Sequence, residues 1–302
     1  MPNLRRFGVV SDEIHQDPDV AFRVANELGM GSVDLNAVWN KSIADVTELE
    51  AQRLKELLRR YGLDVTLLAG PTFKSFVVAG HTKHSLLDDA QFQEHMRVLE
   101  RSILVAKALN ARYVRVFGFR WPHMQGLGNP SPRRPHGGEI SGDELDLIVC
   151  GLRAACALAE RHDVVLGIEN VRSCYANSGR NTGLIVDAVA SDRLKVVWDP
   201  GNAFVSGEEP PYPGGYEAVK KETVHVHAKD ARVVDASSGL TAWECIDEGE
   251  VGWAEQLARL AREYEGPIAL ETHWRPADAA PEAASRASFA ALVRLWSEVG
   301  GD

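Results

Sequence analysis

The sequence is poor in cysteine and contains no long apolar segment. Its four cysteines are Cys150, Cys156, Cys174 and Cys245, and their spacings match no zinc-binding motif. Cys150 and Cys156 fall within a helical pattern, where small buried thiols are usual, so we expect no disulfide framework and a reducing compartment. No run of residues is long enough to cross a membrane, and the opening MPNLRRFGVVSDEI lacks the apolar core of a signal peptide. These absences predict a cytoplasmic protein without a membrane partner.

Positive charge is also in short supply. The 302 residues include 33 Lys and Arg against 43 Asp and Glu, which gives a formal net charge of −10. Such a balance argues against a broad electrostatic grip on nucleic acid or on an anionic membrane. The apolar fraction of 45% is ample for one large core. We therefore expect no nucleic-acid partner and a core that suits one domain of this length.

Apolar runs that are typical of buried strands alternate with helical patterns along the whole chain. In the second helical pattern Thr47 is a suitable N-cap, and Gly62 is a suitable stop. The predicted strands cover residues 6–14, 32–39, 63–70, 111–119, 164–170, 194–200, 223–230 and 267–274, and the predicted helices cover 18–29, 46–62, 86–109, 142–163, 182–191, 214–222, 251–265 and 283–299.

Eight strand–helix units joined by right-handed crossovers close naturally into a barrel. A doubly wound open sheet is the competing fold, but no Gly-rich dinucleotide turn follows the first strand. The sequence therefore predicts an α/β fold, a (β/α)8 TIM barrel, with residues 1–302 as a single domain. Two long connections, Arg120–Ser141 and Asp230–Gly252, follow strands and are therefore expected on the catalytic face of the barrel.

Each of the last four strand patterns ends in a residue that can bind a metal. These residues are Glu169, Asp199, His227 and Glu271, and the carboxyl ends of barrel strands are where active sites lie. Three carboxylates and one imidazole form a hard ligand set, which favours Mn²⁺; Mg²⁺, Co²⁺ and Zn²⁺ are alternatives. Four protein ligands leave about two positions of a six-coordinate ion open, enough for two neighbouring oxygens of a sugar. The sequence predicts one divalent metal ion and a small-molecule carbohydrate substrate.

Several motifs resemble those of the xylose-isomerase-like superfamily of sugar isomerases and epimerases. The most specific are HVHAKDA (225–231), DEGEVGW (247–253) and the terminal ALETHW (269–274). The opening segment over 11–46 is similar to the first two strand–helix units of that superfamily. The resemblance covers nearly the whole chain.

The resemblance implies roles for the four strand-end residues. Glu169 and Glu271 match the two glutamates that bind the metal and act as opposed acid and base groups. Asp199 and His227 match the remaining ligands. In ketose epimerases a His commonly stands three residues after the strand-six Asp, where this chain has Asn202, and the ketohexose enzymes have a Glu where Tyr175 stands. An amide does not titrate near neutrality, so Asn202 can form hydrogen bonds but cannot relay protons.

The chemistry expected of this ligand set is proton transfer next to a carbonyl through an enediolate. Return of the proton to the same carbon is epimerisation, and return to the neighbouring carbon is isomerisation. Loss of a β-substituent from the same intermediate is elimination. The leading prediction is a metal-dependent epimerase or isomerase of a ketose, keto-sugar or cyclitol, and the alternative is a carbon–oxygen lyase such as a dehydratase or a 3-keto-glycoside eliminase.

Two other functional classes fit the sequence less well. An AP endonuclease of this superfamily requires additional His ligands from earlier strands, and LLAGPTFK and VRVFGFRW offer none. A non-catalytic subunit would not need all four ligands. The sequence leaves the oligomeric state open, a homo-oligomer included.

Further residues follow strands and are candidates to line a substrate pocket. For each there is a plainer structural role: packing for the aromatic rings, a solvated loop for Arg232, a rim ion pair with Asp230 for Lys229, and turn closure for Asn170. His225 is expected to be a hydrogen-bonded core residue. The substrate-binding candidates are Trp39, Lys74, Phe117, Arg120, Asn170, Asn202, Lys229 and Arg232.

Overall fold

Eight parallel strands close into a barrel in the computed structural model, which describes residues 4–122, 124, 133–277 and 279–300. The strand order around the barrel is β1-β12-β9-β8-β7-β6-β5-β2, and β1 pairs in parallel with both β12 and β2. This closed order confirms the predicted TIM barrel. The barrel strands are β1 (Phe7–Val10), β2 (Ser32–Leu35), β5 (Asp64–Leu68), β6 (Tyr113–Phe117), β7 (Val165–Glu169), β8 (Leu194–Trp198), β9 (Thr223–Ala228) and β12 (Ile268–Leu270).

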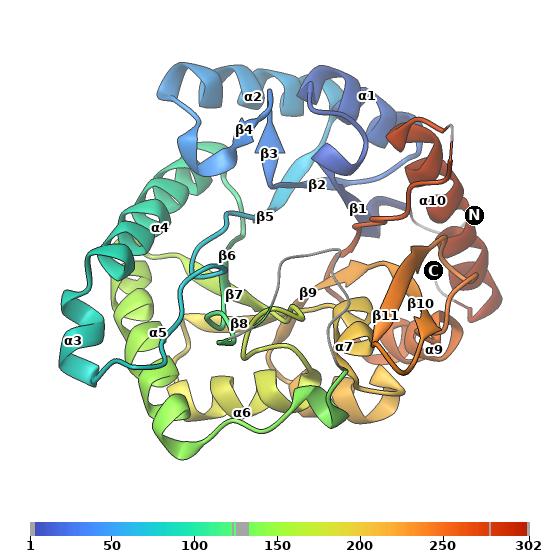
Figure 1. Ribbon diagram of the computed structural model, residues 1–302. Coiled ribbons are helices and arrows are strands. Elements are labelled where there is room, and N and C mark those ends of the chain that lie inside the picture. Colours follow the sequence, from blue (N-terminus) through green and yellow to red (C-terminus); the bar gives the residue numbers. More distant parts are fainter. Residues whose placement is uncertain (1–3, 123, 125–132, 278, 301–302) are drawn as a thin grey trace.

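Helices surround the barrel on all sides (Figure 1). The helices are α1 (Pro18–Glu27), α2 (Glu48–Tyr61), α3 (Lys83–Asp88), α4 (Ala90–Leu109), α5 (Gly142–His162), α6 (Gly179–Val189), α7 (Pro200–Ser206), α8 (Tyr216–Val219), α9 (Trp253–Glu263) and α10 (Pro281–Glu298). At α2 the Thr47 hydroxyl accepts from the Glu50 N–H, the Glu50 carboxylate accepts from the Thr47 N–H, and Gly62 follows in a left-handed conformation with φ 64°. Both predicted ends of this helix are confirmed. Within the described ranges, no helix combines the length and the apolar character that a membrane span requires.

The interior of the barrel is partly apolar and partly charged. Leu67 on β5 contacts Val197 on β8, and because these strands are not neighbours, the contact crosses the interior. The same interior buries Asp34 on β2, Arg115 on β6 and His225 on β9. A charge buried away from water is costly unless it is paired. Each of these polar residues has a partner: Asp34 pairs with His225, and Arg115 pairs with Glu169 at the end of β7.

Some helices differ from the sequence prediction. The helix expected over 86–109 is two helices, because Asp89 ends α3 and its carboxylate accepts from the N–H groups of Gln91 and Phe92 at the start of α4. The helix expected to begin at residue 182 begins three residues earlier, at Gly179, after the N-cap Ser178. In both cases a side chain that caps the helix N-terminus sets the point where the helix begins.

The connection between β8 and β9 also differs. The Asp199 carboxylate caps a short helix, α7, that the sequence did not predict, because the Pro-Gly pair in WDPGNAF is typical of a turn. The helix expected over 214–222 is reduced to α8. Asp199 is therefore both a strand-end residue and a helix cap.

The long connection after β9 contains an antiparallel hairpin. Strands β10 (Asp230–Asp235) and β11 (Leu240–Glu244) pair with each other, where the sequence indicated only a loop over Asp230–Gly252. Strand β10 packs against α7, whose label lies next to the hairpin in Figure 1. The smaller hairpin, β3 (Ala37–Val38) with β4 (Lys41–Ser42), follows β2.

Asp230 anchors the connection that carries this hairpin. Its carboxylate accepts from the backbone N–H groups of Ala231, Asp247, Gly249 and Val251, at 2.9, 3.0, 3.3 and 3.2 Å. A Cβ at Gly249 would lie 2.1 Å from the Asp230 carboxylate, so only glycine fits there. The aspartate of the HVHAKDA motif and the glycine of DEGEVGW therefore form one structural unit.

We expect the substitution Asp230→Ala to loosen this connection. Buried or half-buried N–H groups would lose their acceptor, at a cost of about 1–3 kcal/mol for each fully buried donor left unsatisfied. Amide hydrogen exchange over residues 245–252 should accelerate, and the melting temperature should fall. The control is Asp235→Ala in the exposed turn of the hairpin, where the carboxylate binds only Ser237 and Ser238. Equal exchange in the two variants would contradict the anchoring role.

Candidate metal centre

Four side chains from consecutive strands of the second half of the barrel meet at one point. Glu169 ends β7, Asp199 follows β8, His227 lies near the end of β9, and Glu271 follows β12. Their ligand atoms all lie within 4.8 Å of one another, and all four residues are buried. The structure thus brings together the four residues that the sequence indicated as ligands.

The His227 ring is oriented as a metal-binding imidazole would be. Its Nε2 lies 3.1 Å from Asp34 Oδ2, while its Nδ1 lies 3.5 Å from Glu169 Oε1 and 3.4 Å from Glu271 Oε2. The buried Nδ1 has no hydrogen-bond partner among the described residues. A carboxylate behind the ring and a free nitrogen facing three carboxylates is the arrangement that fixes the tautomer of a ligating His. The donor set and this unpaired nitrogen fit a divalent cation.

Asp34, which positions His227, was not identified from the sequence. Its Oδ2 also lies 2.6 Å from His225 Nε2, and its Oδ1 accepts from the Leu67 N–H at 3.1 Å. Burial works against its ionisation, but the two imidazoles outweigh burial and lower the pKa of Asp34. The expectation that His225 is a hydrogen-bonded core residue agrees with these contacts. The available signal was an aspartate inside the apolar strand SVDL, since such a residue is almost never buried without partners.

Arg115 is a second residue that the sequence analysis missed. Its guanidinium donates to Glu169 Oε2 at 2.8 Å and to Asn36 Oδ1 at 3.0 Å, and it also binds the carbonyl oxygens of Ala69 and Gly70. Burial opposes ionisation of Glu169, but the adjacent Arg115 lowers the pKa of that carboxyl to about 2. Glu169 is therefore held as an anion with one oxygen committed to Arg115 and the other facing His227.

Lys229 lies between two of the candidate ligands. Its Nζ is 2.7 Å from Asp199 Oδ2 and 2.5 Å from Glu271 Oε2, and the residue is 1% exposed. Burial opposes the charge, but these carboxylates raise the pKa of Lys229, which stays an ammonium. Lys229 in turn lowers the pKa of Glu271 against the effect of burial. No ion pair joins Lys229 to Asp230 in the described part of the chain, so the rim ion pair considered for them is wrong.

Two asparagines complete the surroundings of the carboxylates. The Asn202 amide donates to Glu169 Oε1 at 3.2 Å, to Asp199 Oδ2 at 2.9 Å and to the Asn170 carbonyl at 2.9 Å. The Asn170 side chain pairs with the backbone N–H and C=O of Asp199. Both residues therefore position ligands. The pKa of Asp199 is raised to about 6 by burial, which exceeds the opposing effect of Lys229.

Another cluster of possible metal ligands lies beside Glu271. Glu13, which follows β1, accepts from the His273 ring at 2.7 Å and from Arg275 at 2.5 Å. Ligand atoms of Glu13, Glu271 and His273 lie within 4.8 Å of one another. His273 has φ 48°, and its ring centroid is 5.3 Å from that of Trp243 on β11. The motif ALETHW did not predict a role for His273, and no sequence pattern indicated Glu13.

The remaining substrate-binding candidates divide into two sets. Lys74 and Phe117 lie next to the centre: Lys74 Nζ is 4.9 Å from the Phe117 ring centroid, and Arg115 lies 4.8 Å from the same ring. Burial, with a contribution from Arg115, lowers the pKa of Lys74.

The members of the other set have local contacts, and their role in lining the site stays a prediction. Arg120 donates to the Met124 carbonyl. Trp39 packs under the Arg53 guanidinium at 5.1 Å. Arg232 is half exposed and pairs with Glu244 across the hairpin.

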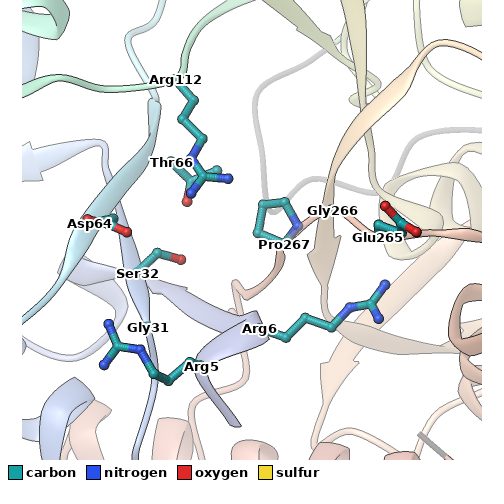
Figure 2. A pocket seen from close by; sticks show the side chains of 10 residues that line it. All are labelled: Arg5, Arg6, Gly31, Ser32, Asp64, Thr66, Arg112, Glu265, Gly266 and Pro267. Atoms are coloured by element: carbon teal, nitrogen blue, oxygen red, sulfur yellow. The ribbon is translucent and has the colours of Figure 1, made fainter. Parts of the chain in front are cut away.

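A separate hollow of about 390 Å³ lies at the opposite end of the barrel (Figure 2). Its lining residues precede or begin strands, which places them at the amino ends, where conserved features serve stability rather than catalysis. Figure 2 shows Arg5, Arg6 and Arg112 around it. The guanidinium of Arg6 lies 4.9 Å from the Trp296 ring, so this arginine packs against the closing helix. This hollow is distinct from the metal centre.

The sequence profile of the xylose isomerase-like TIM barrel family matches residues 22–295. The chain belongs to this family, which confirms the resemblance seen in its motifs. No curated protein sequence matches the chain.

Solved structures share the fold at low sequence identity, which establishes the fold alone. The zinc-bound crystal structure of the IolI protein is 15% identical, with 100% of each chain covered and a TM-score of 0.74. The probable 3-DHS dehydratase AsbF from Bacillus anthracis is 16% identical over 96% of this chain and 98% of its own, with a TM-score of 0.68. The 3-keto-D-glucoside 4-epimerase YcjR from E. coli is 16% identical over 95% of this chain and 98% of its own, with a TM-score of 0.66.

Proposed function

We propose that this protein is a divalent-metal-dependent epimerase or isomerase of a keto-sugar, ketose or cyclitol. The observation that carries the proposal is the convergence of three buried carboxylates and the unpaired Nδ1 of His227 within 4.8 Å. Mn²⁺ suits this oxygen-rich set, and the zinc in IolI indicates that softer ions deserve the same test. The bound ion would polarise a substrate carbonyl and so acidify the neighbouring C–H.

The chain supplies two carboxylates that differ in their surroundings. Glu169 is fixed by Arg115 and Asn202, while Glu271 is held by Lys229 and lies beside the Glu13–His273 pair. We assign to these two glutamates the removal and the return of the substrate proton. Asp199 and His227 serve as ligands only, because Asp199 caps α7 and the back of the His227 ring is committed to Asp34. The phenyl ring of Phe117 and the ammonium of Lys74 are assigned to the substrate side of the centre.

Added Mn²⁺ is expected to raise the melting temperature of the chelator-treated protein. An ion that binds only the folded state stabilises it by about 2.7 kcal/mol at 100 times its Kd. The shift should grow with metal concentration and should be mostly lost in Asp199→Ala, which removes the donor oxygens together with the charge. Differential scanning calorimetry over a metal titration measures both. The absence of any shift at millimolar Mn²⁺ would refute the proposed centre.

A carbon–oxygen lyase acting through the same centre is the second candidate. Asn202 favours it, because the amide is fully engaged with Glu169, Asp199 and Asn170 and cannot relay a proton between substrate oxygens. The solved structures that share the fold of this chain include both a probable dehydratase and an epimerase. NMR in D₂O over a panel of ketoses, inososes and 3-keto-glycosides separates the two. Deuterium incorporation without loss of a carbon–oxygen bond supports the isomerase, and release of water or an aglycone supports the lyase.

A further inference from the structure

The ammonium of Lys229 uses carboxylate oxygens that a metal ion would need. Glu271 Oε2, the oxygen that binds Lys229 at 2.5 Å, is also the Glu271 atom that faces the unpaired Nδ1 of His227 at 3.4 Å. The other partner of the ammonium is Asp199 Oδ2, at 2.7 Å. Two of the three carboxylates in the centre therefore already share one positive charge that belongs to the chain.

Because the side chain of Lys229 is flexible, its ammonium can occupy a second position. A lysine is a compact point charge on four methylene groups, and its direction can change without moving the backbone. The Nζ already lies 5.4 Å from the ring centroid of Trp243 on β11. An aromatic face at this distance attracts a cation. The ammonium can therefore leave the carboxylates while remaining inside the centre.

We propose that Lys229 is an internal competitor of the metal ion, whose ammonium must leave Asp199 and Glu271 before a divalent cation can bind there. The proposal rests on the proposed metal centre and adds to it a conformational step at one side chain. Like charges repel, so the ammonium and the cation exclude each other from the same pair of oxygens. The metal-bound state is then the state in which Lys229 is free to face a substrate.

Calorimetric titration with Mn²⁺ tests this without any assay of activity. Lys229→Met removes the competing charge and keeps the length of the stem, so its Mn²⁺ affinity should exceed that of the wild type by about tenfold, within the 5–150-fold range usual for coupled binding events. Lys229→Arg keeps the positive charge and should show no such gain. If Lys229→Met fails to fold, Lys229→Gln, which is neutral but still forms hydrogen bonds, should show the same gain.

Lys74→Met is the matched control. Lys74 is a second ammonium near the centre, but among the described residues it lies over the Phe117 ring and forms no salt bridge with a carboxylate. A gain confined to Lys229 variants supports direct competition. Unchanged or weaker binding in both neutral Lys229 variants, or an equal gain in Lys74→Met, would overturn it. If the wild type and every variant fail to bind Mn²⁺, Zn²⁺ or Mg²⁺, the proposed metal centre itself is wrong.

Discussion

Replacing Glu271 or Glu169 with Gln is expected to lower turnover by about 10²-fold or more, the usual contribution of a general acid or base. Gln keeps an oxygen donor and the size of the side chain, so each variant should retain much of its metal. The two variants should differ in the step of the reaction that each can still perform. If the glutamates serve different steps, one variant will still exchange substrate hydrogen with solvent but will not complete the reaction.

Metal content, solvent-hydrogen exchange and product formation should be measured on both variants with the substrate that the NMR panel identifies. Glu56→Gln on the exposed face of α2 is the control for removing one carboxylate from the protein, and it should behave as the wild type. Full turnover in Glu271→Gln or Glu169→Gln would show that the glutamate concerned is only a ligand. The mechanism with two carboxylates would then have to be abandoned.

Asp34→Ala is expected to have the largest effect on stability. The substitution leaves two buried imidazoles, His225 and His227, without the carboxylate that accepts from both. Removal of one partner from a buried charged pair typically costs about 3–5 kcal/mol in the free energy of unfolding. Because His227 also loses the group that orients its ring, metal affinity should fall by about 10–100-fold.

Asp34→Asn provides the matched comparison, because Asn keeps the shape of the side chain and its amide oxygen can still accept one hydrogen bond. Its unfolding free energy and Mn²⁺ affinity should lie between those of the wild type and Asp34→Ala. Chemical denaturation and calorimetric titration measure the two quantities separately. If Asp34→Ala binds Mn²⁺ as tightly as the wild type, Asp34 does not position His227.

The sequence was sufficient to predict the strands and the residues at their ends. A run such as LKVVWDP is apolar until it ends, so a carboxylate at its end stands out. Asp34 and Arg115 lie within strands, in SVDL and YVRVF, and nothing in one sequence says whether such a residue points into the barrel or toward a helix. Their function depends on partners that are far away in the chain: His225 across the barrel for Asp34, and Glu169 on the neighbouring strand β7 for Arg115.

The short elements were missed for a different reason. Helix α7 begins with Pro-Gly, and the cap that starts it is the side chain of Asp199, which the sequence indicated for another purpose. The hairpin β10–β11 depends on the backbone bonds that Asp230 accepts from a segment about twenty residues further along. Trp39, Arg120 and Arg232 were predicted at the site because they follow strands, and the contacts described for them are with local partners.

The two halves of the barrel contribute different residues to the metal centre. All four proposed ligands come from β7, β8, β9 and β12 or directly follow them, whereas the charged partners of His227 and Glu169 come from the first half: Asp34 on β2 and Arg115 on β6. A half-barrel built from the last four strands would carry every ligand, yet His227 and Glu169 would lose the charged partners that hold them in place. Each half therefore needs the other, not only to close the sheet but to turn four side chains into one site.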